Sequence, residues 1–295
     1  MKVAVAKYRI GEPRDFAVFA ARIRRELEGV ADAGASLAVL PEYLSLELAT
    51  TFGDTVRADL AASLAAIQGH RDAWLALFAQ LARDTGMQLA AGSFLLDLGG
   101  GRYRNRCDLF APSGAHRWAD KLQLTGFEKA AGMIDGGDAL RVFDAGGLRL
   151  GVAVCYDIEF PLPVRRQCEA GARLLLVPSC TDTAAGATRV QVGCLARALE
   201  NRCFVAQAVT AGDAPWSPAL DTNTGEATVY APMDAGLPAD GILARTAGDD
   251  GWAIAEIDPA WLDASRGAAQ VANDRDWPAQ DLPALAAAEV VPFRR

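Results

Sequence analysis

The chain has 295 residues, of which 51% are hydrophobic and 22% charged, a composition typical of globular proteins rather than disordered ones. Its net charge of -8 argues against a basic surface for nucleic acid or for an anionic membrane. No segment approaches the roughly 18 consecutive apolar residues of a membrane span, and the first apolar stretch is too short for a signal peptide. We therefore expect a cytoplasmic protein.

Cysteine and histidine are too sparsely placed to predict a metal centre. The six cysteines contain no CxxC pair, and neither of the two histidines has a partner at metal-ligand spacing. We expect reduced thiols and no metal or organic cofactor. Five of the cysteines are predicted to be packing residues: Cys107, Cys168, Cys180, Cys194 and Cys203.

The first half of the chain alternates between apolar runs and amphipathic stretches. Strands are predicted over Lys2 to Lys7, Leu37 to Pro41, Gln88 to Asp97, Tyr103 to Phe110 and His116 to Lys121. Helices are predicted over Asp15 to Ala33, Thr55 to Ile67 and Arg71 to Thr85. The glycine cluster Gly99 to Gly101 predicts a hairpin between two of these strands.

The second half continues the alternation after a hairpin over Phe143 to Cys155. Helices are predicted over Pro163 to Ala170 and Thr188 to Arg202. Strands are predicted over Arg173 to Pro178, Cys203 to Ala208, Glu226 to Pro232 and Trp252 to Ile257. Ala211 to Asn223 is predicted to be a loop, and the tail from Asp274 to Arg295 an extended arm.

This mixture of consecutive strands and strands separated by helices predicts an α/β architecture, with mixed sheets covered by helices. We find no internal repeat and no low-complexity linker. The chain is therefore predicted to form a single domain over residues 1–295, with the extended arm starting at about residue 274.

Three of the predicted strands end beside a side chain that could carry chemistry. Glu42 follows the strand that ends at Pro41, where partial burial would raise its pKa toward that of a general base. Lys121 ends a short strand and could stabilise an oxyanion or a thiolate. Cys155 ends a buried strand, where ligand sites of α/β sheets tend to lie, and a thiol there could act as a nucleophile.

Taken singly, each residue has an ordinary structural interpretation. Glu42 could be a solvated loop glutamate, Lys121 a surface lysine and Cys155 one more buried core cysteine. The choice depends on whether the three side chains meet in the folded protein.

The motifs around these residues together resemble the nitrilase, or carbon-nitrogen hydrolase, superfamily. The resemblance rests on PE at Pro41 and Glu42, DKL around Lys121 followed by FE, and CYDIEFP from Cys155. Later segments are similar as well: VPSC at Val177 to Cys180, RALENRCFV at Arg197 to Val205, and NTGEATVYAP ending at Pro232. The agreement covers roughly residues 1 to 260 in the family's order.

The resemblance implies an α-β-β-α sandwich with two mixed β-sheets, which usually dimerises through a helical face into a longer stack. It implies a Glu-Lys-Cys triad, which falls on Glu42, Lys121 and Cys155. A glutamate shortly after the lysine is common in the family, and Glu128 takes that position. An amide carbonyl needs help to accept a negative charge, so Lys121 and the backbone N–H of Tyr156 are the expected oxyanion donors.

The sequence departs from the family's pattern in places that bear on the substrate. Glu159 stands where many relatives have arginine, Leu162 where they have glutamate, and Lys7-Tyr8 where a glutamine is frequent. The expected substrate contacts follow strand ends: Tyr43, Ser179, Thr181 and Asp182.

The leading hypothesis is a hydrolase that cleaves a non-peptide C–N bond of a small linear amide, carbamoyl or ureido compound through a cysteine thioester. An acyltransferase that passes the same thioester to an amine, a nitrilase and a catalytically silent scaffold are the alternatives. The expected partners are a small amide-like molecule and a second copy of the chain, in a homodimer or higher homo-oligomer. We expect no binding to nucleic acid or to a membrane.

Overall fold

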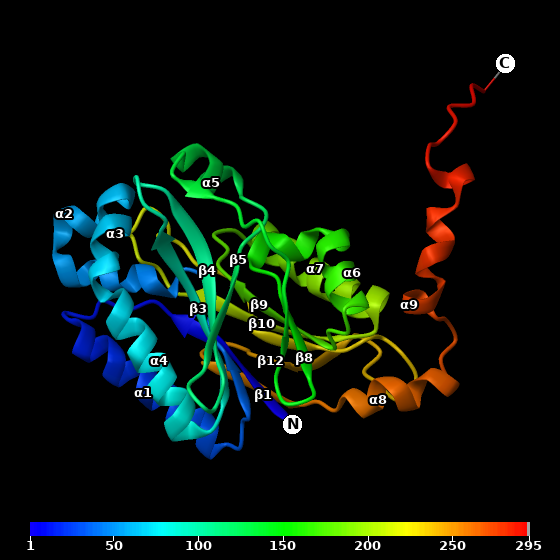
Figure 1. Ribbon diagram of the computed structural model, residues 1–295, viewed down its shortest axis with the longest axis horizontal. Helices are drawn as coiled ribbons and strands as arrows, with labels where there is room; N and C mark the ends of the chain where they lie inside the picture. The colour runs from blue at the N-terminus through cyan, green and yellow to red at the C-terminus, as the bar shows by residue number, and fades with distance from the viewer. Residues whose placement is uncertain (294–295) are drawn as a thin grey trace.

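The computed structural model describes residues 1–293 and places two β-sheets face to face between two layers of helices (Figure 1). The sheets meet at β1 (Lys2–Arg9), the first strand of the chain. The first five residues of β1 pair in antiparallel fashion with β13 (Trp252–Glu256), while its last three pair in parallel with β10 (Phe204–Ala211). One strand therefore belongs to both sheets.

The first sheet continues from β1 through β2 (Leu37–Val39), β3 (Gln88–Asp97), β4 (Tyr103–Phe110) and β5 (His116–Asp120). The strands from β1 to β3 are parallel, whereas β3, β4 and β5 are antiparallel. The short strand β6 (Ile134–Asp135) pairs with β4.

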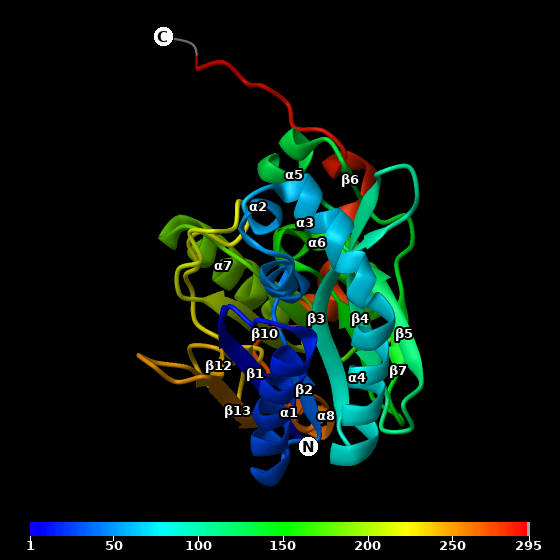
Figure 2. The same ribbon diagram turned by 90° about the vertical axis from the view of Figure 1, so that its left-hand side faces the viewer.

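Helices α1 (Phe16–Asp32), α3 (Leu60–Ile67) and α4 (Arg71–Thr85) accompany the first sheet, and α1 and α4 cover its outer face (Figure 2). Helix α1 forms because apolar residues recur every three or four positions, and these four side chains are buried: Phe19, Ile23, Leu27 and Val30. The Asp15 carboxylate begins the helix by accepting the N–H of Val18 at 2.8 Å.

The second sheet runs from β10 through β9 (Leu174–Ser179), β8 (Arg149–Val152) and β7 (Val142–Asp144). Strand β11 (Thr228–Tyr230) pairs with β10 and with β12 (Ile242–Arg245). Helices α6 (Pro161–Glu169) and α7 (Ala184–Asn201) cover its outer face.

A continuous apolar core fills the space between the sheets. Val5 and Val39 of the first sheet share this core with Leu176 and Val205 of the second, and all four are at most 1% exposed. The near-continuous apolar runs of β9 and β10 follow from burial on both faces. The helix, sheet, sheet, helix order confirms the predicted fold class.

The structure corrects several predicted elements. The single helix predicted over Thr55 to Ile67 is in fact two helices, α2 (Asp54–Arg57) and α3. The break occurs because Asp59 caps the start of α3 by accepting the N–H of Ala62 at 2.7 Å. Several short elements were not predicted from the sequence: β6, β12, α5 (Gly126–Ala131), α8 (Pro259–Ala264) and a 3-10 helix at Leu44–Phe52.

The C-terminal tail was predicted to be an extended arm, but its first half contains helical turns. Helix α9 (Asn273–Asp276) and two 3-10 turns, Trp277–Asp281 and Pro283–Leu285, form its first half. The guanidinium of Arg165 lies 5.0 Å from the Trp277 ring centroid and anchors this half to α6. From there the chain leaves the body of the molecule (Figure 1), and residues 294–295 of the predicted arm lie outside the described residues.

Within residues 1–293, no helix combines the length and the apolar character that crossing a membrane would require.

Candidate active site

Glu42 follows β2 and is 1% exposed. The next residue, Tyr43, adopts a left-handed backbone with φ 61°, which turns the chain sharply after the carboxylate. The Tyr43 N–H donates to Ser93 Oγ at 2.8 Å, and the Ser93 N–H donates to Pro41 O at 3.2 Å. Strand β3 therefore holds both sides of Glu42.

A glycine makes this close approach possible. The pairing of β3 with β4 shifts register between Ala90 and Ser93, and Gly92 lies in that irregularity with φ 70°. A Cβ atom at Gly92 would lie only 2.2 Å from Pro41 O. A side chain there would push the Glu42 loop away from β3.

Lys121 comes directly after β5 and is also 1% exposed. Its backbone N–H donates to Asn105 O at 2.8 Å and so continues the strand pairing. Its ammonium group lies 2.8 Å from Glu42 Oε1 and 2.8 Å from Glu128 Oε2. An ammonium group has three protons, so two of them serve these carboxylates and one is left for another acceptor.

Cys155 begins a 3-10 helix, Cys155–Glu159, just after β8. It is a non-glycine residue with φ 49°, a backbone conformation that costs roughly 1–3 kcal/mol and tends to occur at functional sites. Its thiol donates to Cys180 O at 3.4 Å and lies close enough to Glu42 for that carboxylate to raise the Cys155 pKa.

Asp157 ties the cysteine turn to the lysine loop. Its carboxylate accepts the N–H of Val154 at 3.1 Å, of Leu122 at 3.1 Å and of Gln123 at 2.7 Å. Burial raises the pKa of Asp157 to about 6, although these N–H donors favour its ionised form. One buried carboxyl group therefore sets the positions of Cys155 and Lys121 together.

Glu128 lies on α5, where it forms a capping box with Thr125. The Glu128 side chain is fully buried and accepts the hydroxyl of Tyr43 at 2.8 Å on Oε1. Burial raises its pKa, but the Lys121 ammonium group, the Thr125 N–H and the Tyr43 hydroxyl together outweigh burial and leave the Glu128 pKa below its ordinary value. Glu128 is thus an ionised partner that holds Lys121 in place.

Asn105 is a site residue that the sequence analysis missed. It is fully buried in β4, and its amide nitrogen donates to Glu42 Oε1 at 2.7 Å and to Glu128 Oε1 at 3.3 Å. No local pattern marks it, because it occupies an ordinary inward position of an alternating strand. Its partner Glu42 is 63 residues away in the chain.

The electrostatics of the cluster favour a neutral thiol beside a fixed cation. Burial raises the pKa of Cys155 well above its ordinary value, and the Glu42 carboxylate adds to that effect. Burial also raises the pKa of Glu42, against the opposing effect of Lys121. For Lys121 burial lowers the pKa, but Glu42 and Glu128 outweigh burial and keep the ammonium group protonated.

These side chains open onto a cavity of about 270 Å³. Of the predicted substrate contacts, Tyr43, Thr181 and Asp182 line it, and so does Tyr156. Tyr156 is the second residue of its 3-10 helix, where a backbone N–H has no acceptor within the helix.

Two predictions need correction. Ser179 is fully buried outside the cavity lining, and its hydroxyl donates to Val177 O at 3.4 Å, so its side chain offers no surface to a ligand there. Cys180 is more than a packing residue: it lines the cavity, and its N–H donates to Glu42 Oε2 at 3.0 Å.

The outer part of the cavity is acidic. Asp182 and Asp221 are exposed, and Glu159 is paired with Arg189 at 3.4 Å. Four carboxylates and two cations line the cavity as a whole: Glu42, Glu159, Asp182, Asp221, Lys121 and Arg189. Its entrance therefore repels anions and attracts cations.

Comparisons with known proteins identify similar sequences. The probable hydrolase YhcX of Bacillus subtilis is 29% identical over 246 residues, which make up 83% of this chain and 47% of that protein. The omega-amidase NIT2-A of Xenopus laevis is 27% identical over 63% of this chain and 67% of its own length. The chain thus spans about half the length of the first of these relatives.

Solved structures share the fold. Nit3 of Saccharomyces cerevisiae, a member of the nitrilase superfamily, matches with a TM-score of 0.73 and 20% identity over 93% of this chain and 96% of its own. An amidase from Nesterenkonia sp. AN1, in which acrylamide has added to the active-site cysteine, matches with a TM-score of 0.66 and 24% identity over 94% and 99% of the two chains.

These two structures confirm the predicted nitrilase-type fold. The profile of the carbon-nitrogen hydrolase family matches residues 2–260, in agreement with the resemblance of the motifs. This chain belongs to the carbon-nitrogen hydrolase family.

Proposed function

We propose that the protein is an amidase-type hydrolase, which cleaves a small amide through a thioester on Cys155. The observation that carries the proposal is the convergence of Glu42, Lys121 and Cys155 at one buried cavity, from positions far apart in the chain. The named amidase and omega-amidase relatives support amide hydrolysis as the reaction class.

In the first half-reaction the Cys155 thiol gives its proton to the Glu42 carboxylate and its sulfur attacks the amide carbonyl carbon. A neutral buried thiol needs such a base within reach, because its raised pKa leaves little thiolate at neutral pH. The third proton of Lys121 and the N–H of Tyr156 stabilise the negative charge on the carbonyl oxygen. The C–N bond then breaks, and the proton on Glu42 passes to the leaving nitrogen.

In the second half-reaction Glu42 takes a proton from water, which attacks the thioester carbonyl. The C–S bond breaks, the sulfur regains a proton, and the carboxylic acid leaves. Lys121 stays protonated, because Glu128 remains ionised beside it and continues to raise its pKa while Glu42 carries the transferred proton. Glu128 accordingly acts as a positioning residue.

The acidic entrance narrows the substrate class. An amide whose acyl part carries a carboxylate would meet Glu159, Asp182 and Asp221 with only Arg189 to offset them. A neutral or amine-bearing amide meets no such repulsion. We therefore propose neutral and cationic small amides as preferred substrates.

The test is hydrolysis of matched small carboxamides with neutral, cationic and anionic ends, along with carbamoyl and ureido compounds. Cys155→Ala abolishes turnover of every substrate, while Cys168→Ala, a thiol outside the cavity, retains it. The wild type prefers the cationic and neutral amides at low salt. Turnover retained in Cys155→Ala would refute the proposed mechanism, and a preference for the anionic amide would refute the substrate class.

A further inference from the structure

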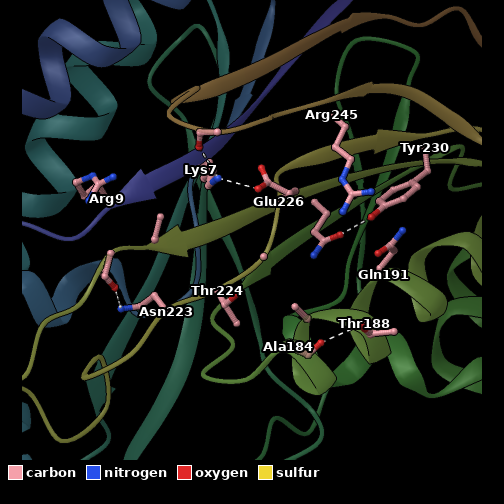
Figure 3. Close-up of a pocket in the computed structure, with 16 residues that line it drawn as sticks. Lys7, Arg9, Ala184, Thr188, Gln191, Asn223, Thr224, Glu226, Tyr230 and Arg245 are labelled. Carbon is pink, nitrogen blue, oxygen red and sulfur yellow. Dashed lines mark hydrogen bonds and ion pairs between the residues drawn. The ribbon is translucent and has the colours of Figure 1, made fainter.

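A second cavity of about 420 Å³ is lined in part by Asn223 and Thr224 (Figure 3). It falls within the range of about 300–1,000 Å³ that is usual for small-molecule sites. None of the residues proposed for catalysis lines it. Arg245, Tyr230 and Gln191 lie at one end of it, and Lys7 and Arg9 at the other.

Three cations and one carboxylate line the cavity, so its lining carries a net positive charge: Lys7, Arg9, Arg245 and Glu226. Lys7 is paired with Glu226 at 2.8 Å, so these two charges cancel. Within the described residues Arg9 pairs only with the exposed Asp249, at 3.6 Å, a contact that solvent screens. Arg245 forms no ion pair with any residue from 1 to 293. In a protein of net charge -8, this cavity is a local site of attraction for anions.

The cavity wall also contains a hydrogen-bond donor. Gln207 is 3% exposed and lines the cavity, and its amide oxygen accepts the Tyr230 hydroxyl at 2.7 Å. Its amide nitrogen donates to nothing within the described part of the chain. The side chain is buried, but its amide nitrogen keeps accessible surface where Gln207 lines the cavity, so its free N–H groups can donate to an acceptor there.

From these observations we infer that the cavity is a second ligand site, which binds a small organic anion. A carboxylate or phosphate group of the ligand accepts hydrogen bonds from the Arg245 guanidinium and from the amide nitrogen of Gln207. Arginine suits this role because its planar fork matches both kinds of oxyanion.

Two hydrogen-bonded backbone segments, around Thr181 and Thr224, connect the second cavity to the proposed active site. The Thr224 N–H donates to Thr181 O at 2.8 Å, and the Thr181 hydroxyl donates to Thr224 O at 2.7 Å. Thr181 lines the catalytic cavity, whereas Thr224 lines the second one. The Cys180 thiol likewise contacts Asn223 Oδ1 at 3.5 Å. A ligand that is held by Arg245 and Gln207 and extends along the cavity to Thr224 therefore couples to substrate binding against Thr181.

The binding experiment is isothermal titration calorimetry with citrate and, separately, inorganic phosphate at low ionic strength. The anion that binds more tightly shows whether the site recognises a carboxylate or a phosphate group. Arg245→Gln weakens binding about tenfold or more, the loss typical of a charged hydrogen bond. Gln207→Glu weakens it as well, while keeping an acceptor for the Tyr230 hydroxyl.

Arg189→Gln is the matched control, because it removes the cation at the mouth of the catalytic cavity and leaves the second cavity intact. An equal loss in Arg189→Gln would place the anion in the catalytic cavity and overturn the inference. So would the absence of binding to the wild type, or unchanged affinity in Arg245→Gln.

The coupling rests on the proposed amidase function, whereas the binding experiment does not. The bound anion changes kcat/KM for amide hydrolysis by about fivefold or more in the wild type and leaves Arg245→Gln unaffected. Binding without any change in kcat/KM would overturn the coupling. If the protein hydrolysed no amide at all, the proposed function would be contradicted. The calorimetric result would still show whether the second cavity binds an anion.

Discussion

At the scale of single residues, Asn105 affects the pKa of Glu42, the proposed general base. Its amide N–H donates to Glu42 Oε1 and so favours the ionised carboxylate, which lowers the Glu42 pKa. Asn105→Ala removes that donor, so the Glu42 pKa rises and the base remains protonated to higher pH. The acid limb of the pH profile of kcat/KM is expected to move up by roughly one unit.

Asn201→Ala is the matched control, because Asn201 is another buried asparagine whose amide donates to Arg197 O in α7. It leaves the acid limb in place. A loss of activity in Asn105→Ala that is equal at every pH would mean that Asn105 only supports the structure.

Site residues at strand ends could be predicted from the sequence, whereas a site residue inside a strand could not. Glu42, Lys121 and Cys155 each follow a strand, and a polar residue after an apolar strand is visible in the chain itself. Asn105 lies inside a strand, where alternation hides it, and its role depends on contacts with Glu42 and Glu128 across the fold. Ser179 lies at a strand end as well, yet it is fully buried and does not line the cavity.

At the scale of elements, the irregularity in β3 sets the position of Glu42. Gly92→Ala puts a methyl group 2.2 Å from Pro41 O and imposes a left-handed backbone on alanine, so the Glu42 loop must move. We expect at least a hundredfold loss of kcat, because small displacements of a reacting group are costly. Stability falls by about 1–3 kcal/mol, measured by urea unfolding.

Gly29→Ala provides the comparison, since nothing lies within 4 Å of that position and its backbone is helical. It is neutral or slightly stabilising, because alanine favours a helix by about 1 kcal/mol over glycine. A Gly92→Ala enzyme with normal kcat would show that β3 does not fix the base.

Elements with a strong period or an apolar run were predicted well, and short ones were not. The stripe of α1 and the runs of β9 and β10 fix those elements by burial. The short elements α5 and β12 depend on tertiary contacts: α5 is held by the Glu128 capping box beside Lys121. A six-residue helix leaves too little pattern to be predicted alone.

At the scale of the whole molecule, the layered fold leaves apolar residues on its second helical face. Leu162 of α6 is 62% exposed and Val192 of α7 is 58% exposed. We propose that two copies pack through this face, as the family resemblance implies. Val192→Arg then shifts the wild-type dimer to the monomer in size-exclusion chromatography with light scattering, because an unpaired buried charge is costly.

Val18→Arg, on α1 of the opposite helical layer, serves as the control and leaves the dimer intact. A wild type that is monomeric at all concentrations, or a dimer that both variants keep, would contradict the proposed interface.

Cys155 is proposed to carry the acyl group during turnover, and intact mass spectrometry can detect that group on the protein. The protein is mixed with a small amide that it hydrolyses and is quenched in acid during turnover, and the modified peptide is then sequenced. The account predicts a mass increase equal to the acyl group on Cys155 and none in Cys155→Ala. An acyl group on Cys180, the other thiol that lines the cavity, or turnover without any adduct would contradict it.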